Sequence, residues 1–396
     1  MSKPKIRFNG FTEDWEQRKL ETISDVRDGT HDSPQYVQDG HPFITSKNVG
    51  NGFINYDDIQ YVSNKDYEEI NKRSKVDIHD ILMGMIGIIG NLALIREKPD
   101  FAIKNVALIK YTGTINYKFL YHILQSSYVT NQLLRGMDGG TQKFIALNKI
   151  RGLDIPFPTE KEQHAIGVYF ENLDHLITLH QRKCEQTKKL KKFMLQKMFP
   201  QNGKAVPEIR FNGFMEDWEQ RKLGEVFQEY SKKNHPELQT LTIIQGSGTV
   251  LREESNRNLQ YDKSSLSGYK MVCENDFIVH LRSFEGGLEK SNHNGLISPA
   301  YHTFHGDNVD SRFYYSYFRS YEFIKHKLVP HVYGIRDGRS IDIDGMKTIK
   351  IPYTSYDEQK KIGDYIESLD HLITLHQRKC DELQNMKKFM LQNMFV

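Results

Sequence analysis

The chain has 396 residues with 54 basic and 51 acidic side chains, so its net charge of +3 excludes the overall basicity of a histone-like nucleic-acid binder. Nucleic-acid binding would then require basic groups gathered on local surfaces. A hydrophobic share of 38% with 11% aromatic residues excludes wholesale disorder, and the length predicts two or three packed units.

The sequence also argues against a membrane or secreted location. The longest apolar stretch, at 81–95, is broken by glycines and is shorter than the roughly 20 residues that span a bilayer. The N-terminus lacks the apolar segment of a secretory signal, and three cysteines cannot form a disulfide framework in a chain of this length. We therefore expect a cytoplasmic protein without membrane contact.

The first globular segment opens with "IRFNGFTEDWEQRKL" at 6–20, which recurs at 209–223 with one change. Segments 81–95 and 101–111 predict strands joined by glycine turns. The stretch 117–137 has helical spacing of its apolar residues, and 144–158 returns to alternation. Together these patterns predict an α+β domain.

A long helix follows. "PTEKEQ" (158–163) predicts its start, with Thr159 as a plausible N-cap. Ile166, Phe170, Leu173 and Ile177 then form a narrow apolar stripe, which is typical of a seam between two helices. The segment "PQNGKAVPE" after this helix has the glycine and prolines of a linker.

The second half of the chain repeats the plan. Segment 312–329 corresponds to the helical stretch of the first half, "SIDIDGM" (340–346) parallels "FIALNKI" (144–150), and the apolar stripe returns from Ile362 onward. The predicted boundaries are 1–155 for the first domain, 156–200 for its helix, 201–208 for the linker, 209–352 for the second domain and 353–396 for its helix. We expect the two helices to pack as an antiparallel coiled coil about a pseudo-twofold axis.

The segment "LDHLITLHQRKC" at 173–184 recurs unchanged at 369–380, including polar positions that must lie off the seam. One explanation is that both copies present the same surface to the same kind of partner. The alternative is a recent duplication, or recombination that exchanges the globular segments. The candidate partner-binding residues are Asp174, His175, Thr178, Gln181, Arg182, Asp370, His371, Thr374, Gln377 and Arg378.

Paired rods of this kind would hold the two domains on a fixed spacer, facing the same way. Double-stranded DNA has local twofold axes and presents the same groove once per turn of about 34–36 Å. Two unlike domains on such a spacer would read two unlike short sequences separated by an unread gap.

The chain resembles the specificity subunits of type I restriction–modification systems. The residues that carry this resemblance are "KFIALNKIRGLDIPFPTEKEQHAI" (143–166), the F-x-x-L-D-H-L-I helix at 170–177, the two "WEQRKL" openings and "FIVHLRSFEGG" (277–287). The resemblance covers essentially the whole chain, and the tandem plan makes it specific.

The resemblance implies two target-recognition domains that alternate with two packed helical spacers, and no catalytic centre in this chain. It implies binding of two methyltransferase subunits, which modify adenine in each half of a bipartite target in double-stranded DNA. Restriction subunits driven by ATP would join through that assembly. S-adenosylmethionine, ATP and Mg²⁺ would then belong to the partners, with no cofactor here.

No catalytic motif stands in the sequence. "NGKA" (202–205) lacks the first glycine and the hydroxyl of a P-loop, and there is no Asn/Asp-Pro-Pro-aromatic tetrapeptide of an amino-methyltransferase. "PD" at 99–100 lacks the acid-x-Lys partner of a nuclease metal site. Two rivals remain open, a stand-alone enzyme with an unrecognised site and a tandem protein-binding adaptor.

Two His/Cys pairs suggest a metal site at first sight. His180/Cys184 and His376/Cys380 are each four residues apart, so each pair shares one helix face, and antiparallel pairing would form a Cys2His2 set. The same positions continue the apolar stripe, where such side chains simply pack. We expect packing and no metal.

Candidate DNA contacts lie in predicted loops. Arginine suits the O6/N7 edge of guanine, and glutamine or asparagine suits adenine, although a phosphate contact or a solvated charge is the alternative for each residue. The candidates are Lys47, Asn48, Gln142, Lys143, Gln245, Arg252, Arg282, Arg336 and Arg339. The lysines near the end of the first helix (188–197) are either phosphate contacts or a solvated face; since the second copy keeps only Lys387 and Lys388 of them, the solvated face is favoured.

Overall fold

The computed structural model describes residues 4–140, 143–201, 204–255, 263–334 and 339–395. Contacts divide the chain into two units. Unit 1 comprises Met1–Gln181 with Arg378–Val396, and unit 2 comprises Arg182–Gln377. Each unit therefore contains one globular domain and a segment of both long helices, α6 (Glu160–Lys197) and α11 (Tyr356–Asn393).

The described residues of unit 1 form two four-stranded sheets and two short strand pairs. The first sheet is antiparallel, in the order β2-β9-β6-β7, and the second has the order β3-β5-β4-β8, in which β4 and β8 are parallel. The strands are β1 (Glu16–Lys19), β2 (Asp25–Asp28), β3 (Tyr36–Val37), β4 (His41–Thr45), β5 (Gln60–Val62), β6 (Ile81–Gly84), β7 (Leu92–Leu94), β8 (Ala102–Lys104), β9 (Val106–Lys110), β10 (Met137–Asp138), β11 (Phe144–Ile145) and β12 (Asp154–Phe157).

Short helices are interspersed with the strands of unit 1. They are α1 (Leu20–Ile23), η1 (Ser46–Asn48), α2 (Asn64–Ser74), α3 (Tyr117–Ile123), α4 (Ser127–Arg135) and α5 (Leu147–Arg151). The single helix expected at 117–137 is two helices, because the Ser126 hydroxyl accepts the Val129 amide and starts a new helix. That prediction was therefore only partly right.

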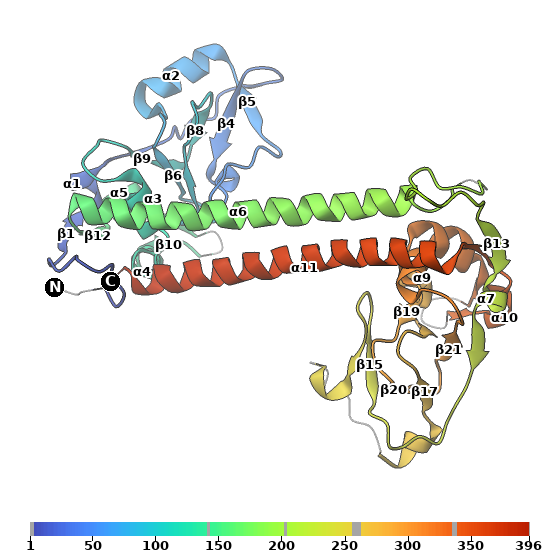
Figure 1. Cartoon of the computed structure of the whole chain (residues 1–396). Coiled ribbons are helices and arrows are strands. Elements are labelled where there is room, and N and C mark those ends of the chain that lie inside the picture. Colours follow the sequence, from blue (N-terminus) through green and yellow to red (C-terminus); the bar gives the residue numbers. More distant parts are fainter. Residues whose placement is uncertain (1–3, 141–142, 202–203, 256–262, 335–338, 396) are drawn as a thin grey trace. The chain divides into compact units, whose positions relative to one another are not determined.

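The long helices run antiparallel within unit 1. The Phe170 ring of α6 lies 5.7 Å from the ring of Phe395, just beyond the end of α11, while Asp174 contacts Lys387 one turn further along. The Ile6 amide donates to the Asn393 carbonyl (3.0 Å), which ties the start of the chain to the same end of α11. Figure 1 shows this red end of α11 beside the blue and green elements of unit 1.

Unit 2 repeats the plan with different loops. Its main sheet has the order β14-β21-β18-β19, and β13 pairs with β24 as β1 pairs with β12. The strands are β13 (Glu219–Lys222), β14 (Gln228–Tyr230), β15 (Leu241–Ile244), β16 (Gly248–Leu251), β17 (Lys270–Val272), β18 (Phe277–Val279), β19 (Glu289–Lys290), β20 (Gly295–Ile297), β21 (His302–His305), β22 (Val332–Tyr333), β23 (Ser340–Ile341) and β24 (Lys350–Tyr353).

The short helices of unit 2 are α7 (Leu223–Val226), η2 (Arg252–Glu254), η3 (Lys263–Gly268), α8 (Ser283–Gly286), α9 (Ser311–Phe318), η4 (Glu322–Leu328), η5 (Val329–His331) and α10 (Ile343–Lys347). The helical stretch expected at 312–329 is α9 followed by a π-helical segment, η4. In this unit too α6 and α11 run antiparallel, because Cys184 lies near Gln377 while Lys191 reaches Asp370.

Each core includes the residues that directly follow the far end of a long helix. Met394 and Phe395 are buried in the core of unit 1, and Met198 and Phe199 are buried in the core of unit 2. The predicted fold class, α+β with a long helix after each domain, is confirmed.

Candidate functional site

A buried ion pair joins the first domain to α6. Arg7 donates from Nε to Glu162 Oε1 (2.6 Å) and from Nη2 to Oε2 (2.7 Å), and the Trp15 indole donates to Oε2 (3.1 Å). The next residue, Gln163, accepts the Asn116 amide (2.9 Å) and donates to the Pro158 carbonyl (2.9 Å). The Glu162 side chain is fully buried, so the carboxylate depends on these donors.

Unit 2 contains the same joint. Arg210 donates to both carboxylate oxygens of Glu358 (2.7 and 2.8 Å), and the Trp218 indole donates to Oε2 (3.0 Å). Gln359 accepts the Asp310 amide (3.0 Å) as Gln163 accepts that of Asn116. The repeated opening and the repeated Glu-Gln are therefore two halves of one structural joint, which the repeats alone did not predict.

The repeated polar residues of the long helices have partners within the chain. In unit 1 Lys387 contacts Asp174 (2.6 Å), and in unit 2 Lys191 contacts Asp370 (2.5 Å). These lysines belong to the repeated "KKFMLQ" segment, so the structure gives them a role that neither the solvated-face nor the phosphate interpretation included.

The other predicted partner-binding residues divide into two groups. The hydroxyls of Thr178 and Thr374 donate to the carbonyls of Asp174 and Asp370 in their own helices (2.9 Å each). The remaining six are exposed, namely His175, Gln181 and Arg378 in unit 1 and Arg182, His371 and Gln377 in unit 2.

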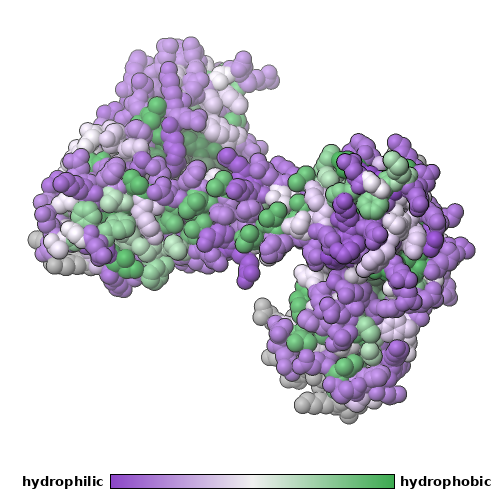
Figure 2. Space-filling model, viewed as in Figure 1, coloured by the Kyte–Doolittle hydropathy of each residue, from purple (hydrophilic) through white to green (hydrophobic). Residues whose placement is uncertain are grey.

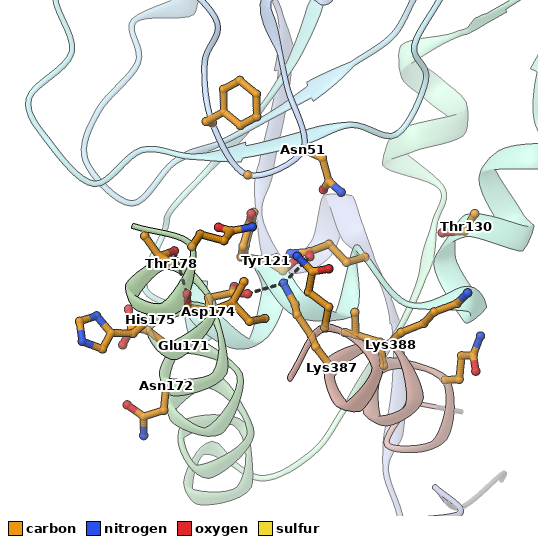
Figure 3. Close-up of a pocket in the computed structure, with 18 of the residues that line it drawn as sticks. Asn51, Tyr121, Thr130, Glu171, Asn172, Asp174, His175, Thr178, Lys387 and Lys388 are labelled. Atoms are coloured by element: carbon orange, nitrogen blue, oxygen red, sulfur yellow. Dashed lines mark hydrogen bonds and ion pairs between the residues drawn. The ribbon is translucent and has the colours of Figure 1, made fainter. Parts of the chain in front are cut away.

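Four of the ten predicted partner-binding residues line a cleft of about 1290 Å³ in unit 1. Asp174, His175, Thr178 and Gln181 of α6 form one side, and Lys387 with Lys388 of α11 forms another. The Lys387 ammonium group donates to Asp174 (2.6 Å) and to the amide oxygen of Gln125 (3.1 Å). In Figure 3 Lys387 reaches toward Asp174, while His175 points away from the cleft.

The loop at 51–53 and Tyr121 of the domain also line the cleft. Burial raises the pKa of the Tyr121 hydroxyl to about 12. The tyrosine hydroxyl therefore stays neutral at physiological pH and acts only as a hydrogen-bonding group. Polar and apolar side chains both line the cleft, and it joins the repeated helix surface to loops that are particular to unit 1.

The DNA candidates of unit 1 gather at the turn after β6. Lys47 and Lys143 are both exposed; the Lys143 carbonyl accepts the Gly87 amide (3.1 Å), and Ser46, beside Lys47, accepts the Ile86 amide (3.3 Å). The same turn exposes 54% of Ile88. We call these three exposed side chains, Lys47, Ile88 and Lys143, the β6-turn surface.

Two other candidates of unit 1 are not part of this surface. The Asn48 side chain is 3% exposed, and its carboxamide accepts the Thr45 amide (3.0 Å) and donates to the Asn55 carbonyl (3.1 Å). It therefore stabilises η1 and is not presented to solvent, in contrast to the expectation. Gln142 lies outside the described residues.

In unit 2 three candidates gather around α8. Arg282 is exposed at its N-terminal end, and the Arg339 guanidinium lies 4.4 Å from the centre of the Phe284 ring. Gln245 packs on Gly286, since a Cβ added there would lie 2.0 Å from its amide nitrogen. We call Gln245, Arg282 and Arg339 the α8 surface.

A half-buried histidine supports the start of α8. Burial lowers the pKa of His280, and its Nδ1 accepts the Arg282 amide (3.2 Å), so the neutral ring holds the backbone at that position. Arg252 is not part of the α8 surface, because it lies half-buried in η2 at the opposite end of β16 from the turn that carries Gln245. Arg336 lies outside the described residues.

The thiols of both long helices are buried. Cys184 is buried with its sulfur 3.8 Å from the Ile373 carbonyl, and Cys380 belongs to the core of unit 1. Among the residues that the structure describes, no group of three or more His, Cys, Asp or Glu is placed to hold a metal ion. None of the helices found there is long and apolar enough to cross a membrane.

Comparisons with known proteins agree on one family. The model of the type I restriction modification DNA specificity domain matches residues 12–189 and 215–385. A putative type I restriction enzyme specificity subunit (MjaX) of Methanocaldococcus jannaschii is 25% identical over 97% of this chain and 93% of its own length. The EcoBI specificity subunit of Escherichia coli is 27% identical over 41% of this chain and 35% of its own length.

A solved structure shows the same fold. The S subunit of a type I restriction–modification system from M. genitalium is 15% identical, with a TM-score of 0.62 over 100% of this chain and 99% of that one. The chain therefore belongs to the type I restriction–modification specificity family, and it recognises DNA sequence as the specificity subunit of a type I restriction enzyme.

Proposed function

We propose that the two units each read one half of a bipartite, asymmetric DNA target and that the long helices bind two methyltransferase subunits. Restriction subunits join through that assembly. The chain carries no catalytic site, and S-adenosylmethionine, ATP and Mg²⁺ act in the partner subunits. The observation that carries this proposal is that identical joints and helix segments hold dissimilar exposed turns in the two units.

The exposed turns have the chemistry of base and phosphate contact. The α8 surface combines an amide with two guanidinium groups, which suit adenine and guanine edges in the major groove. The β6-turn surface combines two ammonium groups with an exposed isoleucine, which suit phosphates and a thymine methyl group. Because the side chains differ, the two units would read different bases.

The long helices expose apolar side chains at repeated positions. Leu176 and Leu372 are 39% and 41% exposed, and Phe193 and Phe389 are 47% and 54% exposed. Figure 2 shows hydrophobic residues among hydrophilic ones on the surface of both units. Large apolar side chains left exposed at the same positions in two copies favour docking of the same partner twice.

The docking part is tested by Phe193→Ser and Phe389→Ser, which change exposed side chains and should leave the fold intact. Each single variant is expected to lower the number of methyltransferase subunits per complex from two to one, and the double variant to abolish binding. Native mass spectrometry of the purified assembly measures this. Full assembly of the double variant would contradict the proposed surface.

The DNA part is tested by the salt dependence of binding. Phosphate contacts release counterions, so the logarithm of the association constant of the chain with its methyltransferase must fall with the logarithm of the salt concentration. The chain alone should show no turnover of DNA with Mg²⁺ or S-adenosylmethionine. Turnover by the purified chain would make it an enzyme, and an absent salt dependence would make it a protein-binding adaptor.

A further inference from the structure

Unit 2 contains a second fully buried carboxylate, away from the joint. Glu289 lies in β19 with no exposed surface. A buried carboxylate is unfavourable unless donors surround it, so its presence calls for a specific set of partners. The Glu289 carboxylate lies against the turn between β15 and β16, and this turn carries Gln245.

Both oxygens of Glu289 are engaged, and they share their donors between this turn and α9. Oε1 accepts the Gly246 amide (2.8 Å), and Oε2 accepts the Gly248 amide (3.1 Å) and the Tyr315 hydroxyl (2.8 Å). The Arg319 guanidinium pairs with Oε1 and neutralises the charge. The carboxylate therefore ties the backbone of the turn to α9.

The turn needs such a tie because of its backbone geometry. Gly246 and Gly248 have φ values of +88° and +78°, which strain residues with side chains and which glycine adopts freely. Glycine also gives the unfolded turn more conformational entropy, which is lost on folding. The hydrogen bonds from the Gly246 and Gly248 amides to Glu289 select one conformation of the turn. In that conformation Gln245 packs on Gly286 of α8.

We propose that Glu289 is a positioning residue for sequence recognition: it fixes the β15–β16 turn against α8, so that Gln245, Arg282 and Arg339 face the DNA as one surface. It acts through Gln245, since its own side chain has no access to DNA. This inference rests on the proposed reading of a half-site by unit 2.

At this position of the sheet, unit 2 has a carboxylate and unit 1 does not. Glu289 pairs with Ile278 of β18, and the matching pair in unit 1 is Ala93 with Leu82 of β6. Ala93 offers no group that could hold a turn. The effect of removing the carboxylate must therefore appear in one half-site only.

The test compares Glu289→Gln, Gln245→Ala and the double variant, each in the complex with the methyltransferase. Methylation rates are measured on the cognate target and on targets with single-base changes in either half. Glu289→Gln keeps the shape but replaces one accepting oxygen with a donor that cannot accept a glycine amide. Discrimination is the ratio of the methylation rate on the cognate target to the rate on a target with one changed base. Glu289→Gln should reduce it about tenfold at the base positions that Gln245→Ala affects, as expected for loss of one oriented base contact.

Three outcomes support the inference together: the double variant is no worse than Gln245→Ala, discrimination in the other half-site is unchanged, and the control Asp276→Asn leaves discrimination intact. Asp276 is a matched carboxylate of unit 2, 3% exposed, that accepts the Cys273 amide and the Tyr230 hydroxyl. If Glu289→Gln does not assemble, Gly246→Ala takes its place, because a side chain at φ +88° strains the same turn and its Cβ would lie 3.0 Å from the Arg319 guanidinium that pairs with Glu289.

An equal fall in methylation on all targets, or an effect that adds to that of Gln245→Ala, would overturn the positioning role. The proposed function fails in a different way. In that case Gln245→Ala, Arg282→Ala and Arg339→Ala would each leave discrimination unchanged in both half-sites.

Discussion

In unit 1 Glu162 accepts three hydrogen bonds from Arg7 and Trp15, and in unit 2 Glu358 accepts the same three from Arg210 and Trp218. The exposed turns of the two units, in contrast, carry different side chains. Lysines flank an isoleucine in the β6-turn surface, whereas the α8 surface carries a glutamine and two arginines. The two units therefore keep the same Arg-Trp-Glu contacts, with one further bond from the Thr354 hydroxyl in unit 2, while their exposed turns carry different side chains.

The largest effect is expected from breaking a joint. Glu162→Ala leaves the Arg7 guanidinium and the Trp15 indole without their acceptor, and loss of one partner of a buried pair costs about 3–5 kcal/mol. Glu358→Ala should cost at least as much, because Glu358 accepts the corresponding three hydrogen bonds and also one from the Thr354 hydroxyl. Urea denaturation of the two variants measures both losses, and a clearly smaller loss for Glu358→Ala would contradict the equivalence of the joints.

The recognition surfaces should respond separately. Arg339→Ala should relax discrimination at one base of one half-site by about 1–3 kcal/mol, as loss of an arginine–guanine contact would. Lys143→Ala should weaken binding about equally for all sequences and reduce the salt slope by about 1, as loss of a phosphate contact would. Affinities for a set of single-base variants at two salt concentrations separate the two. A base-specific effect of Lys143→Ala would reverse its assignment.

A pH effect should distinguish the units. His122 is buried in unit 1, stacked on Phe170, and burial, with the nearby charges of Lys387 and Arg96, lowers its pKa well below the usual 6.5. Its counterpart in unit 2 is Ser316, since Asn116 and Asp310 cap the two helices in the same way.

The sign follows from linkage. Below pH 6.5 the unfolded chain takes up a proton that the folded chain refuses, so stability falls as the pH falls, by at most about 1.4 kcal/mol per pH unit. His122→Leu should remove this slope, as measured by urea denaturation between pH 7 and pH 5. An unchanged slope in the variant would show that other groups cause the acid sensitivity.

The smallest effects are expected from the ion pairs of the long helices. The Asp174–Lys387 side chains are 26% and 17% exposed, and the Asp370–Lys191 side chains are 52% and 25% exposed. Asp174→Asn should cost about 1 kcal/mol or less, and Asp370→Asn still less because water screens that pair more strongly. Both losses should shrink at high salt. A larger loss for Asp370→Asn would mean that its role extends beyond the pair.

The repeat and the long helices could be predicted because periodic patterns are local. The stripe of Ile166, Phe170 and Leu173 predicts the seam from spacing alone, and all three are buried. The joint could not be predicted in this way, since Arg7 and Glu162 meet only after the domain has folded. The repeated Arg, Trp and Glu were visible in both copies, but spacing gave no sign that they touch.

The candidate DNA residues were predicted by type, with mixed results. Lysine and arginine stay exposed because desolvation of their charges is unfavourable, which placed Lys47, Lys143 and Arg282 correctly on the surface. Asn48 has no charge, and its amide is satisfied by backbone groups of η1. Glu289 was missed because nothing in its sequence neighbourhood shows that a glycine turn would fold over it.

The central claim is that each unit reads its own half-site independently of the other. It is tested most directly by replacing residues 24–140 with the same segment of another family member and mapping methylated adenines in cells that express the chain with its methyltransferase. We predict that one half of the target changes while the other half stays as it was. A change in both halves, or in neither, would contradict the account.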